Sequence, residues 1–185
     1  MDLDNPQPLA WFQVWVRAFT RPWPANYRTL IRDPQASPAR GYWWIFAASI
    51  FACVIWTMLL VYGIERVQPD LFDTSFTLLS IIELTMLGIA VGGIICLVVI
   101  INAAIHNQLA YWLGGTGNFD NLTYAQSLAL PLVVILVPLY GFPIFYVPLL
   151  NIVALKAVHA LSWIKAAIPV LITTSLWISL VLWLN

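Results

Sequence analysis

The chain has 185 residues, of which 62% are hydrophobic and only 9% are charged, and its mean hydropathy is +0.87. Soluble domains carry about 25% charged residues, so this composition excludes a water-soluble protein and predicts one that has lipid as its solvent. Eight basic and eight acidic residues balance to a net charge of zero, which excludes the basic excess that nucleic-acid binding demands.

The first 42 residues are predicted to form a cytoplasmic or interfacial N-terminal segment. They hold no short apolar stretch ending at a small-residue cleavage site, so we expect the first span itself to direct insertion. Four aromatic residues recur at helical spacing, with Arg17 on another face: Trp11, Phe12, Trp15 and Phe19. This pattern is typical of an amphipathic helix among lipid headgroups. An aromatic stripe that packs on the rest of the protein is the open alternative.

The remainder, residues 43–185, is predicted to be one helical membrane domain. About 20 apolar residues are needed to cross ~30 Å of hydrocarbon, and five apolar runs are close to that length. The expected spans are about residues 43–63, 88–113, 122–140, 144–160 and 166–184. The fold class that follows is all-α integral membrane, with about five transmembrane helices.

The apolar run over residues 75–113 is ambiguous. It contains no proline, and as a single helix it would extend about 58 Å, which is too long for one crossing. In one arrangement residues 75–87 lie at the interface or re-enter the membrane, and residues 88–113 span it. In the other, the run is a helical hairpin that turns near Gly88, Gly92 and Gly93.

The distribution of basic residues distinguishes a topology of five spans from one of six, because Lys and Arg concentrate on the cytoplasmic side of membrane proteins. With five spans and a cytoplasmic N-terminus only Arg66 lies outside, whereas six spans would also move Lys156 and Lys165 outside. The charges therefore favour five spans. The residues then placed inside are Arg17, Arg21, Arg28, Arg32, Arg40, Lys156 and Lys165.

A glycine-rich turn is predicted at Gly114, Gly115 and Gly117. Bare backbone amides can bind an anion, but a phosphate-binding loop needs a lysine and a hydroxyl residue after its last glycine. Asn118 and Phe119 occupy those places. We interpret the glycines as a structural turn, with an anion or lipid headgroup as the lesser alternative.

The two histidines, His106 and His159, are expected to make hydrogen bonds near the cytoplasmic ends of two spans. Neither has a Cys or carboxylate nearby in the sequence, so no metal or haem site is predicted. Together with Lys156 and Lys165 they could form a small basic pocket for an anionic lipid headgroup.

Polar residues within apolar runs are the remaining candidates, because an amide or charge in hydrocarbon usually faces the protein interior. They are Glu83, Asn102, Gln126, Ser127 and Asn151. Hydrogen bonds between helices account for the amides, and a place at the interface accounts for Glu83, with a proton or cation site as its alternative. No catalytic residue, cofactor or metal is predicted, because no Ser/His/Asp set, carboxylate pair or metal-ligand spacing is present.

Several short stretches resemble one protein family. His106 to Gly115 reads HNQLAYWLGG and continues as TGNFDNLTYAQSLALPL, and residues 152–167 read IVALKAVHALSWIKAA. With RDP and SPAR upstream, these stretches are similar to the Yip1-domain family of multi-spanning membrane proteins, in its prokaryotic form with a short N-terminal segment. The resemblance implies a five-helix fold with a cytosolic N-terminus, in a prokaryotic plasma membrane.

The resemblance also implies a kind of function. Eukaryotic relatives act in vesicle traffic and membrane shaping and contact Rab-type GTPases, but no long cytosolic region or Tyr-Gly-Pro type motif is present here to carry over a GTPase partner. We therefore expect a non-enzymatic structural or interaction component. Its partners are the lipid bilayer and other membrane proteins or a second copy of the chain.

Two alternatives remain for the function. A small transporter or channel would line one cavity with Glu83, Asn102 and Asn151. An accessory subunit of a larger membrane complex would use the ten Trp, seven Tyr and nine Phe residues for protein contacts.

The predicted topology can be tested by cysteine accessibility. In a chain whose two native cysteines are replaced by alanine, single cysteines at Ser37, Thr116 and Ser162 should react with an impermeant thiol reagent from the cytoplasmic side. A cysteine at Thr74 should react from the other side. Labelling of Thr74 and Thr116 from the same side would contradict the topology.

Overall fold

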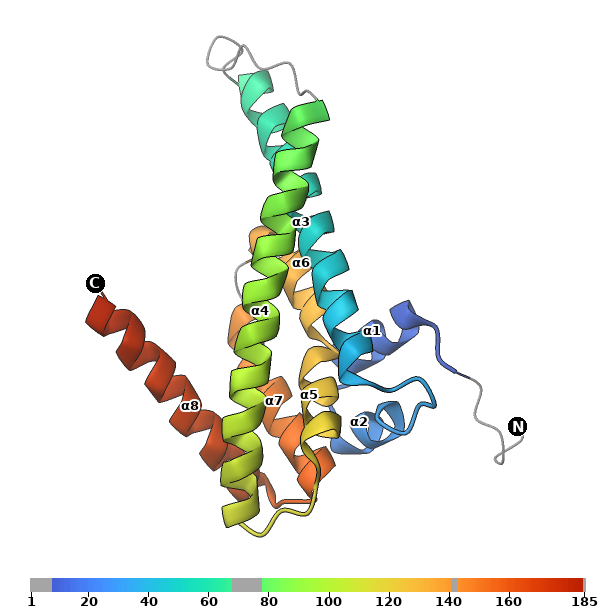
Figure 1. Cartoon of the computed structure of the whole chain (residues 1–185), viewed down its shortest axis with the longest axis vertical. Helices are drawn as coiled ribbons and strands as arrows, with labels where there is room; N and C mark the ends of the chain where they lie inside the picture. Colours follow the sequence, from blue (N-terminus) through green and yellow to red (C-terminus); the bar gives the residue numbers. More distant parts are fainter. Residues whose placement is uncertain (1–7, 68–77, 141–142, 185) are drawn as a thin grey trace.

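The protein is built entirely from helices in the parts that the structure, a computed structural model, describes: residues 8–67, 78–140 and 143–184 (Figure 1). The predicted all-α class is confirmed. In chain order the helices are α1 (Trp11–Thr20), α2 (Pro24–Leu30), α3 (Pro38–Val67), α4 (Leu78–Trp112), α5 (Phe119–Ser127), α6 (Leu130–Tyr140), α7 (Pro143–His159) and α8 (Trp163–Leu184).

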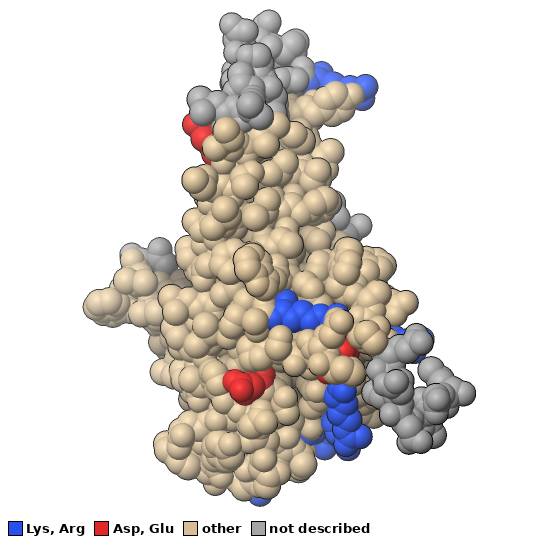
Figure 2. All heavy atoms as spheres, turned by 45° about the vertical axis from the view of Figure 1, so that its right-hand side comes forward, with Lys and Arg blue, Asp and Glu red and all other residues tan. Residues whose placement is uncertain are grey.

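Four stretches in the described residues are long and apolar enough to cross a membrane: Pro38–Gly63, Ile81–Trp112, Phe119–Leu136 and Trp163–Leu184. A fifth apolar helix, Phe145–His159, is shorter. Figure 2 shows a broad uncharged surface on this face, between charged groups near the top of the molecule and others spread over its lower half. The protein is therefore a candidate multi-span membrane protein, and the predicted fifth crossing depends on the shorter helix.

Proline explains the break inside the third of these stretches. α5 ends at Ser127, and α6 begins at Leu130 with Pro131 directly after it. Proline has no N–H to donate to the carbonyl four residues earlier, so the helix is interrupted there. The two short helices together make one candidate span.

Of the two sequence interpretations of residues 75–113, the structure contradicts the hairpin. Residues 75–77 lie outside the described residues, and residues 78–87 are the first part of α4, a continuous helix of 35 residues or about 52 Å. The helical hairpin is wrong, since α4 runs unbroken past its glycines. Figure 1 shows α3 and α4 extending side by side beyond the other helices.

Two of the three α4 glycines, Gly88 and Gly92, serve helix packing. A Cβ atom added at Gly88 would lie 2.6 Å from the Ile50 Cα atom of α3, and one at Gly92 would lie 2.8 Å from Phe46 Cδ1. Small residues at such crossings let two backbones approach closely. Two glycines of the cluster that suggested a turn thus form the contact with the neighbouring helix.

The N-terminal aromatic stripe was interpreted either as a surface among lipid headgroups or as a packing contact with the rest of the protein. Different residues of the stripe fit each interpretation. Trp15 is buried, with its ring edge-on to Trp44 at 5.9 Å between centroids, and Phe19 packs on Tyr146 at 5.5 Å. Trp11 and Phe12 remain 53% and 54% exposed. One part of the stripe therefore holds α1 against the bundle, and the other part is left on its surface.

An ion pair fixes the chain between α1 and α3. Asp33 lies 3.5 Å from Arg40, and its carboxylate also accepts from the backbone N–H of Leu9 at 3.1 Å and of Gln35 at 2.8 Å. Arg40 in turn donates to the Leu9 carbonyl at 2.9 Å and stacks over Trp44. The pair fastens the N-terminal segment to the start of α3.

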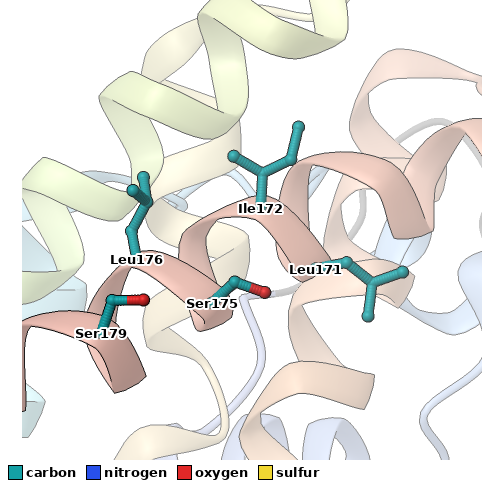
Figure 3. Close-up of a pocket in the computed structure, with 5 residues that line it drawn as sticks. All are labelled: Leu171, Ile172, Ser175, Leu176 and Ser179. Carbon is teal, nitrogen blue, oxygen red and sulfur yellow. The ribbon is translucent and has the colours of Figure 1, made fainter. Parts of the chain in front are cut away.

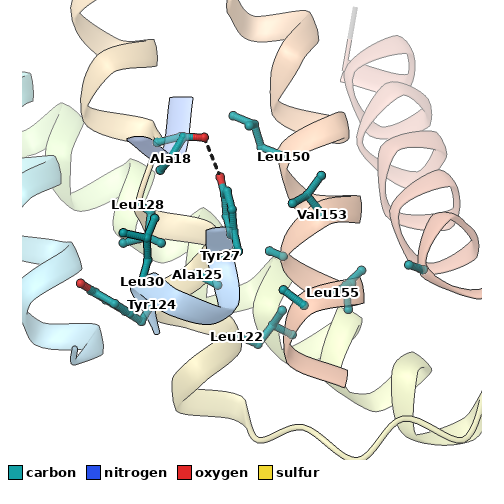
Figure 4. Close-up of a cluster of buried hydrophobic side chains, with 14 of the residues drawn as sticks. Ala18, Tyr27, Leu30, Leu122, Tyr124, Ala125, Leu128, Leu150, Val153 and Leu155 are labelled. Carbon is teal, nitrogen blue, oxygen red and sulfur yellow. Dashed lines mark hydrogen bonds between the residues drawn. The ribbon is translucent and has the colours of Figure 1, made fainter. Parts of the chain in front are cut away.

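The main core lies where α2, α5 and α7 meet (Figure 4). Tyr27 of α2 is fully buried there and donates its hydroxyl to the Ala18 carbonyl at 3.4 Å. Burial raises the pKa of the Tyr27 hydroxyl well above its usual value, so this group remains a neutral donor. Leu122 and Leu155 pack into the same cluster. The basic N-terminal helices are therefore an integral part of the bundle.

The close crossing of α3 and α4 leads to a stability prediction. Gly88→Ala should lower the free energy of unfolding in detergent by about 1–3 kcal/mol, because its methyl group meets backbone rather than a movable side chain. Gly93→Ala is the matched control. No atom lies within 4 Å of its added Cβ, and removing glycine from a helix should be neutral or gain up to ~1 kcal/mol. Equal stability of the two variants would contradict the packing role.

Candidate functional site

A buried histidine joins three helices in the bundle interior. His106 of α4 is fully buried, with its Nδ1 atom 2.7 Å from Gln126 Nε2 of α5 and its Nε2 atom 2.7 Å from Thr173 Oγ1 of α8. The sequence interpretation expected His106 to make hydrogen bonds near the cytoplasmic end of its span, with a basic pocket shared with His159 and the lysines as an alternative. His106 does make hydrogen bonds, and they link it to two other helices inside the bundle.

The direction of these hydrogen bonds follows from the fixed acceptors. The Thr173 hydroxyl lies 3.1 Å from the carbonyls of Pro169 and Val170, which can only accept, so Thr173 accepts from His106 Nε2–H. A buried imidazole with no carboxylate partner is neutral, which leaves Nδ1 to accept from the Gln126 amide. Gln126 Oε1 then remains buried without a protein partner.

A cavity of about 150 Å³ adjoins this link. Asn102 of α4 and Asn151 of α7 line it together with Gln126, so three side-chain amides share one space. The Asn102 oxygen accepts from Trp177 Nε1 of α8 at 2.9 Å. The other lining residues are apolar: Ile94, Ile95, Val98, Val99, Leu130 and Val147. The site can therefore offer uncharged hydrogen-bonding groups in apolar surroundings.

Glu83 does not join the amides. Glu83 is exposed, and it lies 19 positions before Asn102 on α4, or about 28 Å along the helix axis. The transporter hypothesis expected Glu83, Asn102 and Asn151 to line one cavity, and only the two asparagines do so. Ser127, the remaining polar candidate, is buried and donates to the Tyr124 carbonyl within α5.

The glycine turn after α4 is a helix cap of the Schellman type. Gly114 has a positive φ of 87° and donates its N–H to the Tyr111 carbonyl at 3.0 Å, and the Gly115 N–H donates to the Ala110 carbonyl at 2.8 Å. The Gly117 N–H donates to His159 Nδ1 at 3.1 Å. These three amides already have protein acceptors, so the turn does not present them to an anion.

The two lysines also bind carbonyls at helix ends. Lys165 Nζ donates to the Leu113 carbonyl at 2.9 Å, and Lys156 Nζ donates to the Leu161 carbonyl at 3.1 Å. His159 packs its ring on Tyr111 besides accepting from the glycine turn. His159, Lys156 and Lys165 thus fasten the loops at one end of the bundle, with no partner shared with His106.

The site contains residues that sequence reasoning missed. Thr173 and Trp177 supply α8's contacts to His106 and Asn102, yet both lie in an apolar helix without any motif. The signal that was present is their spacing, since residues four apart lie on one face of a helix. In the described part of the chain, no group of three His, Cys, Asp or Glu residues is placed to hold a metal ion.

Comparison of the chain with protein families, with curated proteins and with solved structures found no match. The resemblance to Yip1-domain proteins therefore stays a prediction. The functional argument depends on the geometry of the chain itself.

The histidine link leads to a second stability prediction. Thr173→Val keeps the side-chain shape but leaves His106 Nε2–H buried without an acceptor, and it should lower the free energy of unfolding by about 1–3 kcal/mol. Thr174→Val makes the same chemical change one residue away, where the side chain makes no hydrogen bond to the described residues, and it should change the free energy of unfolding by less than about 0.5 kcal/mol. Denaturant titration of both variants in detergent measures the difference. Similar losses in the two would argue against the link.

Proposed function

We propose that this chain is a multi-pass membrane protein that acts as a non-enzymatic interaction component, of the kind expected from Yip1-like proteins. Its polar interior supports this proposal, since His106, Thr173 and Asn102 are engaged in contacts between helices. The observation that carries the proposal is the position of α8, which presents one face away from the bundle.

The proposed topology has five crossings and a cytoplasmic N-terminus. Arg40 lies at the start of α3, and Arg66 lies near its far end. Lys165 contacts Leu113 beside the C-terminal end of α4, which runs antiparallel to α3 (Figure 1). Arg40 and Lys165 are therefore at one end of the bundle and Arg66 is at the other, which supports the assignment made from charge.

The buried residues of helix α8 all lie in its first half, from Ala166 to Thr173. Its hydrogen bonds to α4 are made by Thr173 and, one turn further along, by Trp177. Figure 1 shows the helix diverging from the bundle toward the C-terminus, where Leu182 and Trp183 are 73% and 79% exposed. Lipid covers an exposed apolar side chain as well as protein does, so exposure alone does not indicate a partner. The divergence from the bundle is the distinctive feature.

Two serines mark the outward face of α8. Ser175 and Ser179 are one helical turn apart, and each lies about 200° around the helix from Thr173 or Trp177, the residues bonded to α4. They line a shallow groove with Leu171, Ile172 and Leu176 (Figure 3). Small residues at this spacing let a second transmembrane helix approach closely and exchange hydrogen bonds. The partner we propose for this face is another transmembrane helix, from a second copy or from a different membrane protein.

The transporter alternative has less support from the structure. The amide-lined cavity holds Asn102 and Asn151 but not Glu83, and no charged side chain is among its lining residues. Ion or proton pathways usually use ionisable groups inside the membrane. The interaction proposal needs no such groups.

Crosslinking in native membranes tests the proposal. A cysteine at Leu182, in a chain with Cys53 and Cys96 replaced by alanine, should form a disulfide-linked or bifunctionally crosslinked adduct larger than the monomer. Ser175→Ile with Ser179→Ile should remove this adduct, because the bulky side chains prevent close approach.

The matched control enlarges a small exposed residue elsewhere. Ala104→Ile on α4 should leave the adduct unchanged. Retention of the adduct in the serine double variant, or absence of any adduct with the Leu182 cysteine, would contradict the proposed interface.

A further inference from the structure

A second, larger cavity lies among α3, α4, α6 and α7. Its volume is about 470 Å³, within the range of small-molecule sites. Apart from Ser49, Cys53, Trp56 and Thr57, its lining is aliphatic, and the Trp56 N–H is already bonded to the Ile135 carbonyl at 2.9 Å. This cavity is suited to a hydrocarbon chain.

The two cavities adjoin each other. Ile95, Leu130 and Val147 line both, so the large apolar space meets the small space that holds the three amides. An elongated molecule placed across them would have its apolar part near Ser49 and its polar end near Gln126. The pair has the shape and polarity of a site for an amphiphile.

Each cavity is lined by a buried polar residue that has one side-chain atom without a hydrogen-bond partner. Ser49 is fully buried and its hydroxyl makes no hydrogen bond, while Gln126 is 6% exposed and its Oε1 atom has none. Asn151 makes no side-chain hydrogen bond within the described part of the chain. Buried polar groups are normally paired, so a donor placed beside the Gln126 amide would supply the partner that its Oε1 atom lacks.

The lining residues also define which polar group the ligand carries. None of them is charged, so an ionised carboxylate or phosphate would be buried without a counter-ion. Gln126 Oε1 can only accept, which requires a donor and disfavours a head that bears carbonyls alone. A hydroxyl satisfies both conditions.

We infer that the paired cavities bind a single-chain lipid with a neutral, hydroxyl-bearing head, of which a monoacylglycerol is the simplest example. The chain occupies the larger cavity, and the hydroxyl groups meet Gln126 and Asn151. Ser49 and Gln126 both lie inside candidate spans, so the ligand enters from the bilayer. This site is separate from the α8 face, and either can fail without the other.

Photolabelling tests this inference with the full chain in detergent. A monoacylglycerol with a diazirine in its acyl chain should label cavity residues such as Cys53, Val91 and Val134, located by mass spectrometry. Unlabelled monoolein should compete, whereas ionised oleate and dioleoyl phosphatidylcholine should not. Equal competition by all three lipids would overturn the inference.

Matched variants separate the cavity from the lipid-facing surface. Ala52→Phe fills the larger cavity and should abolish the specific label, whereas Ala47→Phe makes the same change on the exposed side of α3 and should retain it. Asn151→Leu should weaken monoolein competition about 3- to 10-fold, the loss expected for one hydrogen bond. Circular dichroism checks that each variant is folded. Unchanged cavity labelling in a folded Ala52→Phe variant, or unchanged competition in a folded Asn151→Leu variant, would overturn the inference.

Discussion

Polar groups in hydrocarbon have no water to bind, and His106 meets this constraint by drawing its partners from two other helices. Because Thr173 must face α4 to accept its hydrogen bond, the rotation of α8 about its own axis is fixed. Trp177, one turn further along, then reaches Asn102. The orientation of Ser175 and its outward face is therefore a consequence of an interaction made on the opposite side of the same helix.

The same constraint acts where helices end. The last carbonyls of a helix have no partner within it, and at the end of α4 these are taken by Gly114, Gly115 and the ammonium of Lys165. Lys156 binds the Leu161 carbonyl in the connection between α7 and α8. Residues that form a basic cluster in the sequence are thus separated into individual backbone contacts. This geometry agrees with the structural turn that the sequence favoured and does not present the anion site that was its lesser alternative.

The features that depend on the lipid environment could be predicted from the sequence. The features that depend on contacts between helices could not. Span length and apolar character follow from the membrane, so the all-α, multi-span class could be predicted from hydropathy. A glycine such as Gly88 suits a turn and a close crossing equally well, and only the position of Ile50 shows which applies. Thr173 looks like any residue of an apolar helix until His106 is placed beside it. Partner choice is a long-range property that local patterns do not contain.

The two unpartnered polar atoms have different origins. Gln126 is required by His106, and its amide binds the ring through nitrogen, which necessarily leaves the oxygen on the other side. Ser49 makes no comparable hydrogen bond, and an alanine at this position would remove the free-energy cost of a buried, unpaired hydroxyl. A neutral ligand whose hydroxyl head lies at Gln126 supplies the donor that the first atom lacks. Its acyl chain, which lies beside Ser49, offers the second atom no hydrogen bond, so the ligand accounts for the Gln126 oxygen and not for the Ser49 hydroxyl.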